Sequence, residues 1–112
     1  MASLVGHEAE QLAKDYLLAN SLQFVEQNYK AKVGEIDLVM LDGEQLVFVE
    51  VKFRSSNSHG SAAEQFTYGK RRKLERVINY YLLQKKRNPH HTNLRIDVVA
   101  IDGEQVNWIP NV

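Results

Sequence analysis

The sequence of 112 residues contains no cysteine. Disulfide bonds and thiolate metal sites are therefore excluded, and a metal would have to be bound by carboxylate oxygens or by one of the four histidines. The chain also lacks a net charge, with 14 basic and 14 acidic residues, so no general attraction to nucleic acid or to an anionic membrane is expected. Binding of either kind would need a local cluster of charge.

No apolar run approaches the roughly 18 residues of a membrane-spanning helix, and the first residues include no basic segment of the secretory type. We therefore expect a cytoplasmic protein without a membrane partner. With 44% hydrophobic residues, the chain is long enough for one hydrophobic core and too short for two. We predict a single α/β domain over residues 1–112.

The strongest local signal is a β-hairpin. Apolar and β-branched residues fill two runs, Ile36–Leu41 and Leu46–Val51, and the turn sequence Asp42-Gly43-Glu44-Gln45 separates them. Such a turn between two apolar runs predicts an antiparallel pair of strands.

The length of the turn sets the register of this hairpin. With Gly43-Glu44 as a two-residue turn, Asp37 lies opposite Glu50, and Glu35 lies opposite Lys52. Opposed residues have Cβ atoms roughly 4.5–5.5 Å apart, where two like charges oppose pairing unless a cation lies between them. A divalent cation would satisfy this requirement, and Lys52 would lie beside it because residues two apart in a strand share a face.

A second register is also open. A turn centred on Asp42-Gly43 would pair Glu35 with Glu50, which again opposes two acids. An ordinary half-exposed hairpin with a surface ion pair at Lys52 would explain the charges without any site. We favour a metal-dependent phosphodiesterase site, because four apolar residues occupy the face that would otherwise be polar: Val39, Leu41, Leu46 and Phe48.

The hairpin pattern recurs sixty residues later. Residues Ile96–Ile109 repeat the pattern of Ile36–Val49, with an identical turn tetrapeptide. Where the first copy has its second acid and its lysine, the second copy has Pro110 and Val112. We therefore assign the chemistry to the first hairpin alone, and interpret Asp97, the counterpart of Asp37, as a strand-start or buried hydrogen-bonding residue.

Two helices are also predicted. An apolar stripe in Gly6–Asn20 indicates packing on the sheet, with Glu8 and Glu10 on either side of the stripe. Either carboxylate could reach a site over the sheet, or serve as a favourable charge at the helix start. The second helix is predicted over Tyr68–Arg87, ending before Asn88-Pro89. Between the first hairpin and this helix, residues 53–66 are expected to form a loop.

Eight of the fourteen lysines and arginines fall in the second helix. Four crowd its start, where each cation is unfavourable by a few tenths to ~1 kcal/mol: Lys70, Arg71, Arg72 and Lys73. A bound phosphate would remove that conflict, whereas a solvated helix face would explain the run without a ligand. Lys30 and Lys32, before the hairpin, have the same two interpretations. The loop pair His90-His91 is a weak metal signal.

The acids and the lysine also resemble a known signature. Ile36-Asp37 and Val49-Glu50-Val51-Lys52, with twelve residues between Asp37 and Glu50, resemble the PD-(D/E)XK nuclease motif. Three segments together resemble the small bacterial YraN family over almost the whole chain: Glu10–Leu17, Gly34–Val39 and Leu46–Arg54. That family is functionally uncharacterised and is similar in fold to archaeal Holliday-junction resolvases.

The resemblance implies an α/β, restriction-endonuclease-like αβββαβ core, a mixed central sheet flanked by helices. It implies that Asp37, Glu50 and Glu10 bind Mg²⁺ or Mn²⁺ and that Lys52 is the motif lysine. It selects Glu10 over Glu8, although the glycine usual before that glutamate is Ala9 in this chain. Glu35 belongs to the YraN pattern but not to the general motif.

We therefore expect a metal-dependent nuclease with nucleic acid, DNA rather than RNA, as its partner. Arg54 and the four cations at the start of the second helix are the expected nucleic-acid contacts. Branched DNA is implied by the resolvase likeness alone, and cutting both strands of a symmetric junction would call for a homodimer. Two alternatives stay open: a nucleic-acid-binding module without cleavage activity, and an interaction protein whose basic helix docks an acidic partner.

Overall fold

The computed structural model describes residues 6–55 and 60–112. Its elements in chain order are α1 (Gly6–Ala19), β1 (Gln23–Ala31), β2 (Gly34–Asp42), β3 (Gln45–Arg54), a short 3-10 helix η1 (Ala63–Gln65), α2 (Tyr68–Gln84), β4 (Leu94–Asp102) and β5 (Gln105–Ile109). The predicted αβββαβ order is confirmed, and β5 completes the second predicted hairpin.

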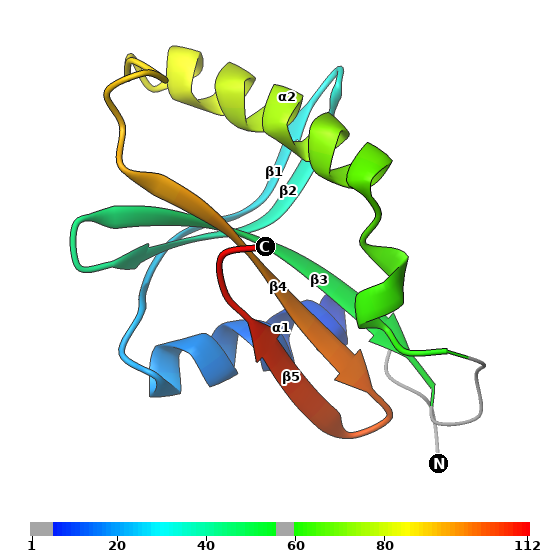
Figure 1. Ribbon diagram of the computed structural model, residues 1–112. Coiled ribbons are helices and arrows are strands. Elements are labelled where there is room, and N and C mark those ends of the chain that lie inside the picture. Colours follow the sequence, from blue (N-terminus) through cyan, green and yellow to red (C-terminus); the bar gives the residue numbers. More distant parts are fainter. Residues whose placement is uncertain (1–5, 56–59) are drawn as a thin grey trace.

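The five strands form one sheet in the order β1-β2-β3-β4-β5. Neighbouring strands are antiparallel except β3 and β4, which run parallel and are joined by the crossover through α2. Figure 1 shows α1 on one face of the sheet and α2 on the other. The predicted mixed sheet flanked by helices is confirmed, and the arrangement is compatible with a restriction-endonuclease-like core.

Each helix buries its apolar stripe on one face of the sheet. Ala9, Ala13 and Leu17 of α1 join a cluster on one face, and five residues of α2 join a cluster on the other: Leu74, Val77, Ile78, Tyr81 and Leu82. The central strand β3 is covered on both faces, because Val47 and Val49 belong to the first cluster and Leu46 and Phe48 to the second. Burial on both faces explains why this strand is apolar without alternation.

The two hairpins share one register. In the first, Leu38 lies opposite Val49 and Leu41 opposite Leu46, so the predicted Gly43-Glu44 turn is confirmed and the alternative turn is wrong. In the second, Val98 lies opposite Ile109 and Ile101 opposite Val106, which is the same pairing sixty residues later. Gly43 and Gly103 take φ angles of 61° and 63°, the left-handed region that glycine tolerates best. The sequence repeat is therefore a structural repeat.

The predicted second helix begins as expected and ends early. Thr67 caps its start by accepting a hydrogen bond from the backbone N–H of Lys70 at 3.3 Å. The helix ends at Gln84 rather than Arg87, because Lys86 takes a φ of 60° and the N–H of Arg87 returns to the carbonyl of Leu82. A left-handed residue with this bond is a common helix stop.

The predicted loop over residues 53–66 is shorter than expected. Phe53 and Arg54 extend β3, and residues 63–65 form η1. Residues 56–59 of this predicted loop lie outside the described residues. In the part of the chain that the structure describes, no helix combines the length and the hydropathy needed to cross a membrane.

Candidate functional site

The strands β2 and β3 separate partway along their length. Their pairing runs from Asp42 and Gln45 to Leu38 and Val49 and stops there. Beyond that point β2 stays paired with β1 as far as Gly34, whereas β3 stays paired with β4. Figure 1 shows the β1–β2 hairpin running alongside α2 while β3 continues in another direction. We call this point of separation the fork.

Asp37 lies at the fork. Its side chain is only 8% exposed, and its Oδ2 atom accepts a hydrogen bond of 2.8 Å from the backbone N–H of Val51. The strand pairing stops one residue short of the expected pair of Asp37 and Glu50. The backbone N–H of Val51 thus donates to the carboxylate of Asp37 and not to a backbone carbonyl of β2. Asp37 and Glu50 therefore come together where the strands separate, and not as a pair within the regular hydrogen-bonded part of the hairpin.

Glu50 is the second acid at the fork. Burial, followed by the charge of Asp37, raises the pKa of its carboxyl from 4.5 to about 7, while the positive charge of Lys52 acts in the opposite direction. The Nζ atom of Lys52 lies 3.4 Å from Oε1 of Glu50, and both side chains are less than a fifth exposed. The predicted neighbourhood of Asp37, Glu50 and Lys52 is therefore present.

Glu10 of α1 joins these residues from the helix on the other face of the sheet. Burial, followed by interactions with Asp37, raises the pKa of its carboxyl from 4.5 to about 7, and the charge of Glu35 contributes in the same direction. Glu8, in contrast, is exposed. The structure thus brings Glu10 to the acids, as the YraN resemblance implies, while Glu35 lies at the margin of the group.

Asn28 belongs to this site and was missed from the sequence. Its side chain hydrogen-bonds to Glu10 and lowers the pKa of that carboxyl, against the larger effects that raise it. Asn28 has a φ of 55° and interrupts β1 where that strand passes Asp37, between the pairs Tyr29–Ile36 and Gln27–Leu38. Asparagine tolerates this left-handed conformation better than most residues, which is the only sequence signal for it.

The three carboxyls at the fork repel one another when all are ionised. A proton or a cation would relieve this repulsion. Among the described residues, no group of three or more histidine or acidic side chains is arranged so that it could hold a metal ion. The chemistry of the acids nevertheless fits Mg²⁺, which proteins usually hold through one or two carboxylates, with water and substrate phosphate completing the octahedron.

The raised pKa of Glu50 gives a prediction for the metal-free protein. Between pH 4.5 and pH 7 the folded state holds a proton on this carboxyl that the unfolded state has lost, so the stability it contributes is complete below pH 4.5 and is lost as the pH rises through 7. Glu50→Gln mimics the protonated form. The variant should therefore match the wild type near pH 4 and exceed it by about 1–2 kcal/mol at pH 8, after a discount for solvent screening.

Urea unfolding with a chelator present measures this difference, and the exposed Glu44→Gln serves as a control that changes the same charge elsewhere. A stability difference between wild type and Glu50→Gln that does not grow with pH would contradict the assignment of the raised pKa to Glu50.

A cavity of about 530 Å³ opens beside the fork, under the first half of α2. Glu50 and Lys52 line it from β3, and Glu35 lines it from β2. Of the four cations predicted to bind nucleic acid at the helix start, Lys70 and Lys73 line this cavity. Glu35, Glu50 and part of the basic cluster therefore line one concave surface, whereas Asp37 and Glu10 do not line it.

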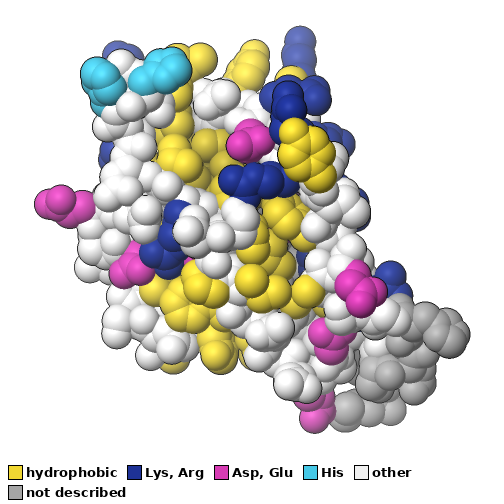
Figure 2. Space-filling view, viewed as in Figure 1, with side chains coloured by type: hydrophobic (Ala, Val, Ile, Leu, Met, Phe, Trp, Pro, Cys, Tyr) yellow, Lys and Arg dark blue, Asp and Glu magenta, His cyan; other side chains and the backbone are white. Residues whose placement is uncertain are grey.

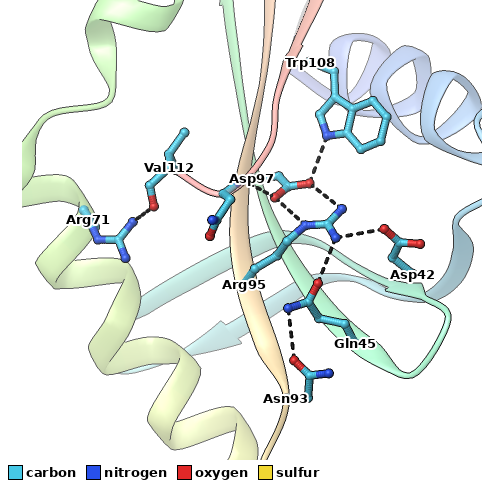
Figure 3. Close-up of polar contacts among 9 residues, drawn as sticks. Asp42, Gln45, Arg71, Asn93, Arg95, Asp97, Trp108 and Val112 are labelled. Carbon is cyan, nitrogen blue, oxygen red and sulfur yellow. Dashed lines mark hydrogen bonds and ion pairs between the residues drawn. The ribbon is translucent and has the colours of Figure 1, made fainter.

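The other predicted nucleic-acid contacts lie elsewhere. Arg71 donates a hydrogen bond to the backbone carbonyl of Val112 (Figure 3) and lies 4.0 Å from Glu75. Arg72 donates to the hydroxyl of Tyr68 at 3.1 Å. Arg54 ends β3, next to Asp102 of β4. The pair His90-His91 is exposed and does not line the cavity.

The second hairpin has the same register as the first but lacks counterparts of Glu50 and Lys52. Asp97 is fully buried and accepts hydrogen bonds from the guanidinium of Arg95, the indole N–H of Trp108 and the backbone N–H of Asn111. Figure 3 shows that Arg95 also reaches Asp42 and Gln45, in the turn of the first hairpin. The prediction of Asp97 as a buried hydrogen-bonding residue is confirmed.

Comparison with known proteins identifies the family of this chain. The model of the uncharacterised protein family UPF0102 matches residues 9–101. A UPF0102 protein of Vibrio campbellii is 49% identical over 109 residues, covering 96% of this chain and 89% of its own. Others from Aliivibrio salmonicida and Colwellia psychrerythraea are 45% and 42% identical, with 95% of this chain and 88% and 85% of theirs covered. The resemblance to the YraN family is thereby confirmed at family level: the chain belongs to the uncharacterised protein family UPF0102.

Proposed function

We propose that this protein is a Mg²⁺- or Mn²⁺-dependent nuclease that hydrolyses phosphodiester bonds of DNA. The observation that supports the proposal is that Glu50, whose carboxyl interacts with Asp37, lines one cavity together with lysines from separate elements, and that Asp37 in turn interacts with Glu10. Acids bind the cation and lysines bind the phosphate in such a site. The proposal includes membership of the PD-(D/E)XK superfamily and a likeness to archaeal Holliday-junction resolvases.

The acids at the fork would hold the cation. Asp37 and Glu50 are the principal ligands, and Glu10 is a third, direct or through water. When bound, the cation polarises the scissile phosphate and lowers the pKa of a coordinated water. The hydrogen bond from the backbone of Val51 fixes one oxygen of Asp37, which leaves the other carboxylate oxygen for the metal.

Lys52 has a separate role in this proposal. Its ammonium group lies 3.4 Å from Glu50 and lines the cavity. From there it can orient the attacking water or stabilise the negative charge that develops on the phosphate in the transition state. Its low exposure strengthens either interaction, because the local dielectric is lower than in water.

The substrate class is part of the proposal. DNA is preferred over RNA and branched DNA over a plain duplex, both from the likeness to resolvases, and a homodimer would suit a two-fold junction. We also propose that the protein is cytoplasmic. Lysine contacts to phosphates carry affinity and no sequence information, so cutting is expected to depend on the structure of the substrate and not on its sequence.

Cleavage of a substrate panel tests the proposal. The panel holds single-stranded, duplex, flap and four-way-junction DNA, and RNA, each incubated with Mg²⁺, Mn²⁺ or a chelator. We expect cutting of at least one DNA that requires a cation. Metal-independent binding without cutting would favour a nucleic-acid-binding module of the same fold. If neither binding nor cutting occurs and metal leaves the melting temperature unchanged, an interaction protein with an ion network at Glu50 and Lys52 is favoured.

A further inference from the structure

Four lysines line the cavity from two separate segments, and the proposed function assigns no individual role to them. Lys30 and Lys32 come from the end of β1 and the tight β1–β2 turn, and Lys70 and Lys73 come from the start of α2. These segments lie about forty residues apart in the sequence. Figure 2 shows lysine and arginine side chains gathered at the upper right, where the start of α2 and the tip of the β1–β2 hairpin lie in Figure 1.

The β1–β2 hairpin is held firmly against α2. A Cβ atom at Gly34 would lie 2.9 Å from Cγ2 of Val77 and 3.6 Å from Cε of Lys73, and Gly34 has a φ of 148°, so only glycine allows this close approach. Further along, the hydroxyl of Tyr29 donates a hydrogen bond to Gln84 at 2.6 Å. The lysines of the turn are therefore positioned by packing and not left on a free loop.

These four lysines lack partners of opposite charge. No ion pair joins Lys30, Lys32, Lys70 or Lys73 to any residue of the described part of the chain. Other cations of the same protein are paired: Lys85 with Glu26, Arg71 with Glu75, and Lys52 with Glu50. Cations held together at a concave surface without a counterion indicate a site for an anion.

The remainder of the cavity wall indicates what the anion is attached to. Ala31 and Val33 line the same space as the lysines, and Val33 is 38% exposed, whereas the lining residues Leu74 and Val77 are only 3% and 1% exposed. An inorganic phosphate would leave Val33 in contact with water, whereas a nucleotide unit would place its sugar against it. Glu50 and Lys52 line the cavity as well, so one strand can reach both the acids and the lysines.

We propose that Lys30, Lys32, Lys70 and Lys73 form a phosphate-binding subsite that holds a backbone phosphodiester of the bound strand, near the phosphate at the acids. The inference rests on the proposed function in naming a nucleic-acid strand as the ligand. The group that the subsite recognises is a phosphate, and a terminal phosphate at the end of a strand has the same chemistry as a phosphate within the backbone. The subsite positions the strand and takes no part in the bond cleavage itself.

Fluorescence anisotropy with a labelled single-stranded DNA tests this subsite. Binding is measured in the presence of a chelator, so that cutting does not interfere, over a series of salt concentrations and with and without a 5′-phosphate. The variant Lys30→Gln/Lys32→Gln is compared with the matched control Lys14→Gln/Lys86→Gln. The control removes the same charge from two lysines that do not line the cavity.

We expect Lys30→Gln/Lys32→Gln, the turn variant, to bind the DNA about tenfold or more weakly than the wild type at low salt. Its slope of log Kd against log salt should fall by about 1.4, since each phosphate contact to a single strand contributes about 0.7. The control should stay within twofold of the wild type, and the loss should be equal for both forms of the 5′ end. Circular dichroism and the melting temperature establish that each variant is folded.

Three results would overturn this inference: no binding by the wild type, equal losses in the turn variant and the control, or a loss confined to the 5′-phosphorylated DNA. These outcomes can be distinguished from a failure of the proposed nuclease activity, because binding and cutting are measured separately. A protein that never cuts but shows the expected salt slopes retains the subsite, whereas a protein that cuts DNA but binds it equally well with both turn lysines replaced has no such subsite.

Discussion

Replacing Asp37 with asparagine is expected to reduce metal-dependent cleavage by at least ~100-fold, because even the loss of a residue that only supports a metal ligand costs 10–100-fold. Asp37 interacts with both Glu10 and Glu50, so no other single substitution would disturb the proposed metal site as much. Asparagine keeps a carbonyl oxygen that can accept the hydrogen bond from the backbone N–H of Val51, so the fork should keep its shape.

The matched control for this experiment is Asp42→Asn, at the other end of the same strand. It removes the same charge from β2, at a side chain that is 47% exposed and does not line the cavity. Single-turnover cleavage of the best substrate from the panel measures both variants. DNA binding by Asp37→Asn should be unchanged or tighter, because a negative charge beside the phosphate has been removed. Wild-type cleavage rates in Asp37→Asn would contradict the role of this residue.

The largest effect on stability is expected at Asp97. Asp97→Ala should lower the free energy of unfolding by about 3–5 kcal/mol, as breaking a buried ion pair from one side typically does. The substitution leaves the guanidinium of Arg95, which is 14% exposed, and the indole N–H of Trp108 without their shared acceptor. At several degrees per kcal/mol in a chain of this size, the melting temperature should fall by roughly 10–20 °C.

Asp42→Ala provides the comparison for Asp97. It removes the other carboxylate paired with Arg95, at 2.8 Å, but its side chain is 47% exposed. A pair of this kind contributes about 1 kcal/mol or less. Denaturant unfolding of the two variants separates the contributions, and a loss at Asp97 no larger than that at Asp42 would show that the buried network does not stabilise the fold as described.

The hairpins were predictable because their signals are local. The strands of the first hairpin are short runs of mostly apolar and β-branched residues, and Gly43 and Gly103 lie where the turn needs a left-handed residue. The turn then fixes the pairing, and the pairing brings Asp37 and Glu50 to the same end of the hairpin. The second hairpin, with the same turn and the same register, served in the sequence as an internal control for the first.

The fork was not predictable from the hairpin alone. Where β2 leaves β3 depends on β1 and β4, which pair with the outer sides of these strands and come from distant parts of the sequence. The same is true of Asn28, whose role depends on passing Asp37 in space. Glu10 could be chosen over Glu8 only from the family resemblance, because periodicity placed both beside the apolar stripe.

The sequence analysis found the cations at the start of α2 but did not predict which of them line the cavity. Counting charges showed a cluster at the start of α2, but it did not separate Lys70 and Lys73 from Arg71 and Arg72. The separating signal was present in the spacing: Lys70 and Lys73 stand four residues before Leu74 and Val77, which line the same cavity, and residues four apart share a helix face. The apolar stripe could therefore have been used to predict which cations of α2 lie on the same helix face as the core residues.

The most direct test of the account is a calorimetric titration of the metal-free protein with Mn²⁺ at pH 7, comparing wild type, Asp37→Asn and Asp42→Asn. The central claim is that the carboxyls at the fork bind a hard divalent cation. Saturable binding by wild type and by Asp42→Asn, lost or greatly weakened in Asp37→Asn, is the result that the account predicts. Absence of binding to the wild type, or equal binding by all three proteins, would contradict it.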